Sequence, residues 1–190
     1  MNICVYGASS TQIDDEYIAL TEELGRRLAA EGHTLVYGAG GAGLMGAVAR
    51  GFKQNGGGVI GVVPSFLKVD GVLYDGCDET IFTETMRERK QIMEDRSQAF
   101  IVTPGGIGTY EEFFEIYTLK QLGRHNKPIV LFNIHGFYDP IMDMLSRAVD
   151  QKFMRKESLR LLTVATSVDE VIEQLSVVDS AVDIRETKFV

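Results

Sequence analysis

Short apolar runs alternate along the chain with longer segments in which apolar residues recur every three or four positions. The runs are rich in Val and Ile and carry few charges, as is typical of parallel strands that are buried on both faces. They predict strands at residues 2–7, 34–39, 59–64, 99–104, 128–133 and 161–166. The longer segments predict helices over residues 14–32, 43–56, 84–96, 109–123 and 140–151. Three of these helical segments end in a glycine, which is a common helix stop: Gly32, Gly56 and Gly123.

Strands that alternate with helices predict an α/β fold with a doubly wound parallel sheet. A chain of 190 residues is the size of one ordinary domain, which we place at residues 1–178, with a C-terminal tail at 179–190. Residues 65–84 show no clean period. We interpret them as a long connection that covers a pocket.

The composition restricts the classes of molecule that the protein is expected to bind. The 19 basic and 27 acidic residues give a formal net charge of −8, which argues against nucleic-acid binding. Two cysteines, Cys4 and Cys77, cannot form a disulfide framework or a zinc site. Since no basic leader and no apolar run of about 20 residues is present, we expect a cytoplasmic protein that does not bind membranes.

Small residues follow three of the predicted strands, at residues 7–11, 38–46 and 104–109. Ligands collect at the carboxyl ends of parallel strands, so these loops predict one composite site. The first two loops contribute these candidate substrate-binding residues: Gly7, Ser9, Gly40, Gly43 and Met45.

The loop GAGGAG has the glycine spacing of a dinucleotide fingerprint at Gly38, Gly40 and Gly43. The fingerprint also needs an acidic residue at the end of the next strand to hold a ribose. That strand ends in VVPSF, which disfavours an NAD-linked oxidoreductase. A tight strand-to-helix turn remains the alternative, and the absence of a following GK[ST] excludes a P-loop.

The loop PGGIGT predicts a phosphate site. Glycines on both sides of Ile107 let backbone N–H groups converge, and a helix that begins near Thr109 would direct its positive end at them. A simple glycine turn is the alternative. Glu111 and Glu112 follow directly. Thr109 and Glu112 fit a capping box; alternatively, one carboxylate faces the reacting carbon of the ligand and is kept ionised by the helix dipole.

A basic cluster stands upstream in TMRERKQIM. Met86, Ile92 and Met93 form an apolar stripe that predicts packing of this helix. Arg89 and Lys90 then lie on its flank and can reach a phosphate. A solvated charged face is the alternative.

Together, TMRERK, PGGIGTYEE and LVYGAGGAGLMG resemble the Lonely Guy family of cytokinin riboside 5′-monophosphate phosphoribohydrolases. The opening VYGASS is also similar to the start of this family's sequences, so the resemblance covers residues 2–175. The family signature PGGxGTxxE is matched by Pro104, Gly105, Gly106, Gly108, Thr109 and Glu112.

The resemblance implies a Rossmann-like homodimer that hydrolyses the N-glycosidic bond of nucleoside 5′-monophosphates to free base and ribose 5-phosphate. It implies that Arg89 and Glu112 are catalytic, and that no metal or other cofactor is needed. It assigns the nucleotide to these residues: Lys90, Gly105, Gly106, Ile107, Gly108, Thr109, Glu111 and Thr118. A carboxylate beside C1′ would stabilise an oxocarbenium-like sugar. The glycine loop and the glutamates would then serve opposite ends of one ligand.

Alternatives stay open at this point. A non-catalytic nucleotide or cofactor carrier of the same superfamily would keep the glycine loops without needing Arg89 and Glu112. A DNA-associated Rossmann-like protein is disfavoured by the net charge. Some such sequences carry a "lysine decarboxylase" label, but no lysine that would bind pyridoxal phosphate can be identified. The GAGGAG loop and residues 65–84 depart from the family pattern, which leaves the preferred base open.

Overall fold

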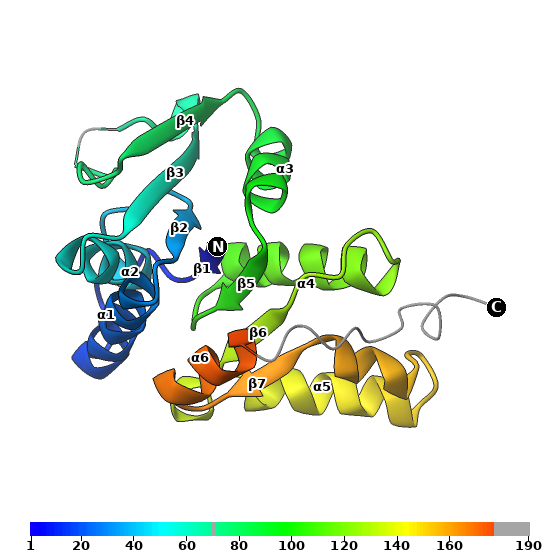
Figure 1. The fold of residues 1–190 in the computed structure, drawn as a ribbon. Coiled ribbons are helices and arrows are strands. Elements are labelled where there is room, and N and C mark those ends of the chain that lie inside the picture. Colours follow the sequence, from blue (N-terminus) through cyan, green and yellow to red (C-terminus); the bar gives the residue numbers. More distant parts are fainter. Residues whose placement is uncertain (70, 177–190) are drawn as a thin grey trace.

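The computed structural model describes residues 1–69 and 71–176. Its centre is a seven-stranded sheet in which every pair of neighbours is parallel, in the order β4-β3-β2-β1-β5-β6-β7 (Figure 1). The strands are β1 (Asn2–Tyr6), β2 (Thr34–Tyr37), β3 (Gly58–Pro64), β4 (Glu79–Thr83), β5 (Ala99–Val102), β6 (Ile129–Phe132) and β7 (Thr163–Ala165). The predicted doubly wound α/β fold is confirmed.

Helices cover both faces of this sheet. They are α1 (Asp15–Ala30), α2 (Gly43–Gln54), α3 (Met86–Arg96), α4 (Ile107–Gln121), α5 (Asp139–Asp150) and α6 (Val168–Ser176). Short 3₁₀ turns lie at Ser65–Leu67, Ile134–Gly136 and Lys156–Leu161. The glycines expected to stop helices lie just beyond α1, α2 and α4, all with positive φ: Gly32, Gly56 and Gly123.

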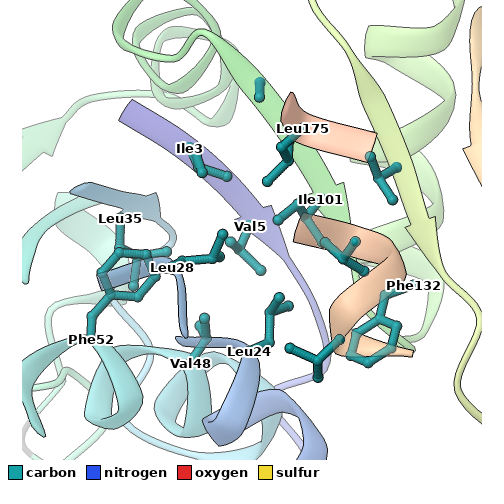
Figure 2. Close-up of a cluster of buried hydrophobic side chains, with 14 of the residues drawn as sticks. Ile3, Val5, Leu24, Leu28, Leu35, Val48, Phe52, Ile101, Phe132 and Leu175 are labelled. Atoms are coloured by element: carbon teal, nitrogen blue, oxygen red, sulfur yellow. The ribbon is translucent and has the colours of Figure 1, made fainter. Parts of the chain in front are cut away.

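The core divides according to the alternation of side chains along each strand. On β1, Ile3 and Val5 point to the face covered by α1, α2 and α6, where they join Leu24 and Leu175 (Figure 2). Cys4, the residue between them, belongs to the opposite cluster together with residues of α3, α4 and α5. Because β1 is buried on both faces, its sequence shows a continuous apolar run and not an alternating one.

Two elements were missing from the sequence-based prediction. The segment 65–84, interpreted as an irregular connection, contains the edge strand β4. Glu79, Thr80 and Phe82 of this strand are exposed, so it lacks the apolar run that marks the central strands. Helix α6, which directly follows β7, was also not predicted. The expected domain boundary at residue 178 and the tail at 179–190 lie outside the described residues.

None of the helices in the described part of the chain combines the length and apolar character that a membrane span requires.

Candidate active site

The strand order reverses between β1 and β5, and the loops that follow these two strands meet at the carboxyl edge of the sheet. The Ala8 N–H donates to the Pro104 carbonyl at 3.1 Å. The Thr103 hydroxyl donates to the Tyr6 carbonyl at 3.0 Å. A Cβ on Gly7 would lie 2.2 Å from that hydroxyl oxygen, so only glycine fits there. Crevices at such a reversal are the usual ligand sites of open α/β sheets.

The loop after β2 packs against the loop after β1. The N–H groups of Leu44 and Met45 both donate to the Ala8 carbonyl, at 2.9 and 3.2 Å. Gly43 has a φ of +58°, and a Cβ there would lie 2.6 Å from the same carbonyl. A Cβ on Gly40 would likewise be too close to its neighbour, at 2.4 Å from Met45 Cε. A tight turn therefore accounts for the spacing of these glycines without any ligand.

The exposed Ser9 lies in the loop after β1. The three loops predicted to form one composite site are thus joined by hydrogen bonds.

The glycine loop after β5 leads directly into α4. The helix begins at Ile107, two positions before the expected start, and Gly106 is its N-cap without any side-chain hydrogen bond to the first turn. The N–H groups of the first turn are therefore open to an anion. A Cβ on Gly106 or Gly108 would meet nothing within 4 Å, whereas one on Gly105 would lie 2.1 Å from the Thr109 hydroxyl oxygen.

The early start of α4 overturns two expectations. Thr109 is not the N-cap, so Thr109 and Glu112 do not form a capping box. Glu111 and Glu112 lie in the second turn, since no acidic residue occupies the first turn. The helix dipole acts mainly on groups in the first turn, so it is not what keeps Glu112 charged. The capping-box pattern had matched because it needs only a hydroxyl and a carboxyl three positions apart.

Arg89 and Glu112 form a buried ion pair. The guanidinium donates from Nη1 to Glu112 Oε1 at 2.6 Å and from Nε to the Val62 carbonyl at 3.1 Å. The two side chains are only 9% and 11% exposed. Gly38 makes room for this arrangement, because a Cβ there would lie 2.2 Å from Arg89 Nη2. The loop after β2 therefore contacts the pair directly.

Burial raises the pKa of the Glu112 carboxyl, and the charge and hydrogen bond of Arg89 offset only part of this effect. Arg89 is thus the main group that favours the ionised carboxylate. Titratable groups with perturbed pKa values in a cleft are candidates for functional residues.

Lys90 lies beside Arg89 but faces a different environment. Its ammonium contacts Glu111 and, at 2.8 Å, Glu115 Oε2. Burial lowers the pKa of Lys90, but the two carboxylates outweigh this and raise it. The side chain is therefore engaged by α4 and not directed at the glycine loop. Thr118 is exposed and lies eleven positions after Ile107, roughly 16 Å along the axis of α4. Within one chain, Thr118 therefore lies far from the glycine loop.

Comparison with known proteins identifies the family. Residues 45–175 match the family described as "Possible lysine decarboxylase". A cytokinin riboside 5′-monophosphate phosphoribohydrolase of Mycobacterium tuberculosis is 40% identical over 170 residues, which is 90% of each chain. Enzymes of the same name from Oryza sativa and Arabidopsis thaliana are 39% and 35% identical over 91% of this chain and 72% and 81% of theirs. The chain belongs to the Lonely Guy family.

Solved structures confirm the Rossmann-like fold of this family member. The molybdenum cofactor binding protein of Rippkaea orientalis is 24% identical over 94% of this chain and 96% of its own, with a TM-score of 0.69. The molybdenum cofactor carrier protein of Chlamydomonas reinhardtii gives a TM-score of 0.71 at 24% identity, over 93% and 96% of the two chains. At these identities the likeness shows the fold alone.

The Lonely Guy family member also has a pocket that the sequence did not reveal. It has a volume of about 300 Å³ and is bounded by residues 104–106 of the glycine loop. Its other walls are Ala8, Ser10, Ile13, Tyr17 and Phe137. These residues come from the loop after β1, from α1 and from the turn after β6, and no local pattern links them.

Within residues 1–69 and 71–176, no group of three or more His, Cys, Asp or Glu side chains is arranged to hold a metal ion. The metal-free reaction stays a prediction.

Proposed function

We propose that this protein hydrolyses the N-glycosidic bond of adenosine 5′-monophosphate or its N6-modified forms, and releases the free base and ribose 5-phosphate. The observation that carries the proposal is the buried Arg89–Glu112 pair next to an open glycine loop. The names of the relatives support the same reaction.

The glycine loop is suited to the 5′-phosphate. The N–H of Tyr110 is the first in α4 to bond back to the loop, at the Gly106 carbonyl, so the three preceding N–H groups have no partner within the helix. Together with the positive end of the helix dipole they favour an anion. Binding energy from the phosphate would hold the ribose in place for reaction.

The carboxylate of Glu112 supplies what the glycosidic bond needs. As the C1′–N bond breaks, the bonding electrons leave with the base and positive charge develops on the sugar. An ionised Glu112 stabilises that charge and directs water to C1′. The oxygen of the water bonds to C1′, and one proton of the water ends on the departing base. Arg89 keeps Glu112 ionised and in position.

Base release from purified protein tests this reaction. We expect AMP and N6-isopentenyl-AMP to give base and ribose 5-phosphate in chromatography without added metal, and adenosine to react far more slowly. Equal cleavage of adenosine would contradict a phosphate site at the loop. Nucleotide binding without any base release would favour the alternative, a non-catalytic carrier, which rests on the fold likeness alone.

Gly106→Val tests the loop separately. The new Cβ has open space and the φ of −97° is allowed for valine, so the variant should fold normally. Its side chain would cover the open N–H groups. Since hydrogen bonds to charged groups contribute about 1.5–3 kcal/mol, we expect the Kd for AMP to rise on the order of 10- to 100-fold in calorimetry. An unchanged Kd would mean that the loop is only a turn.

We also propose a homodimer in the cytoplasm that binds neither nucleic acid nor membranes, as the family resemblance and the composition imply. Sedimentation at micromolar concentration tests the dimer, and a monomer there would contradict it. Cell fractionation tests the location.

A further inference from the structure

The pocket and the Arg89–Glu112 pair share no residue, although both lie near the glycine loop. Arg89 bonds to the Val62 carbonyl of β3, and so places the pair toward the β3 side of the sheet. The pocket instead includes Phe137, which follows β6, and Tyr17 of α1. Neither Arg89 nor Glu112 lines the pocket, so the part of a nucleotide that lies beside Glu112 would not occupy it.

Two aromatic rings and an aliphatic side chain form the far wall of the pocket. Tyr17 and Phe137 meet edge to face, with ring centroids 6.5 Å apart. Ile13, which precedes the N-cap of α1, also lines the pocket. Pro104, Gly105 and Gly106 of the glycine loop line the same pocket. A volume of about 300 Å³ lies at the lower end of small-molecule pockets and accommodates one ring system.

The charges around the pocket disfavour a further anion. Asp14 caps α1, and Asp15 and Glu16 follow in its first turn. Asp139 begins α5 two residues after Phe137. The nearby His135 is paired with Glu16 at 3.2 Å. An uncharged aromatic group therefore suits the pocket better than a second phosphate does.

We propose that this pocket is a subsite for an uncharged aromatic group linked to the phosphate that the glycine loop holds. The protein would then accept nucleotides whose 5′-phosphate is esterified, and not only free monophosphates. This inference rests on the proposed function insofar as that function places a phosphate at residues 105–108. The linkage follows from the shared wall, because residues 104–106 border the pocket and lead into the open first turn of α4.

Calorimetry with phenyl phosphate and inorganic phosphate tests the subsite without requiring catalysis. Burial of a phenyl ring should make phenyl phosphate bind on the order of 10- to 100-fold more tightly than inorganic phosphate. The phenyl ester of AMP should likewise bind at least as tightly as AMP. Ile13→Trp would fill the pocket. It should abolish the extra affinity for phenyl phosphate and weaken the binding of the phenyl ester of AMP, while AMP hydrolysis continues at its normal rate.

Ala19→Trp is the matched control, because Ala19 is an exposed residue of α1, the helix that follows Ile13, and does not line the pocket. Thermal melting checks that both variants fold. If Ile13→Trp does not fold, Tyr17→Trp enlarges another side chain that lines the pocket. Equal affinities for the two phosphates, a phenyl effect that survives the pocket-filling variants, or no binding of either phosphate would each overturn the subsite. A phenyl effect without base release from AMP would support the subsite and contradict the proposed reaction.

Discussion

Two pairs of adjacent residues join α3 to α4, and their environments differ. Arg89 and Lys90 are neighbours on α3, and Glu111 and Glu112 are neighbours on α4. Arg89 and Glu112 face inward and are about one-tenth exposed. The Lys90 side chain is also only 12% exposed, but its partners Glu111 and Glu115 are 52% and 42% exposed.

The difference shows what each pair can contribute. An ion pair with exposed partners contributes about 0–1 kcal/mol, so the Lys90 cluster has only a small part in stability. A buried pair loses the hydration of both charges and is often no better for stability than apolar residues of the same size. Burial of the Arg89–Glu112 pair is therefore weak evidence for a role in stability, and it is compatible with the proposed role in catalysis.

Glu112→Gln should show most clearly that the two ion pairs differ in their importance for turnover. The amide keeps the shape and an acceptor for Arg89 but removes the charge proposed to act beside C1′. We expect turnover to fall on the order of 100- to 1000-fold, with AMP binding retained. Melting temperature should also fall, because Arg89 is left buried without a counter-charge.

Glu111→Gln is the control for that measurement, since it removes a charge one position away on an exposed side chain. We expect its turnover to stay within a few-fold of wild type. Full turnover of Glu112→Gln would identify Glu111 as the next candidate for the catalytic carboxylate.

The double variant Arg89→Met/Glu112→Leu tests the stability argument. Replacement of both charges by apolar side chains should leave the free energy of unfolding equal to wild type or up to about 1–4 kcal/mol higher, with no activity. Urea denaturation measures this. A marked loss of stability would show that the pair holds the fold together, with the Val62 carbonyl as the group left without its donor.

The pH dependence of turnover should report the environment of Glu112. Its pKa is raised by burial, so the acid limb of kcat should lie above the pH 4.5 of an ordinary glutamate and fall tenfold per pH unit below that limb. The same shift makes the contribution of Glu112 to stability largest below pH 4.5 and lost as pH rises through its folded pKa. The stability of the double variant, which has no carboxyl at position 112, should lack this pH dependence. An acid limb at or below pH 4.5 would contradict the assignment.

Lys90→Met should have the smallest effect on stability. We expect the free energy of unfolding to change by less than about 1 kcal/mol, and added salt to reduce the difference. A large rise in KM for AMP with unchanged stability would instead support the family-based assignment of Lys90 to the substrate. Urea denaturation and steady-state kinetics on one preparation distinguish the two outcomes.

Much of the fold and part of the site could be predicted because they depend on local pattern. Buried parallel strands appear as apolar runs, and helices as three-to-four spacing, so all predicted strands recur in the structure. The edge strand β4 was missed because its exposed residues break that pattern. The start of α4 was misplaced because glycines at 106 and 108 favour a loop, although one of them caps the helix and the other lies within it.

The sequence by itself determined the α/β alternation, the glycine loop, the acidic composition and the family motifs, since each is a property of neighbouring residues. Only the tertiary structure decided that Arg89 contacts Glu112 while Lys90 contacts Glu111 and Glu115. It also decided that three separate elements form a pocket beside the loop. Burial and pairing arise from contacts between distant segments, and these set the pKa of Glu112 and the space next to the glycine loop.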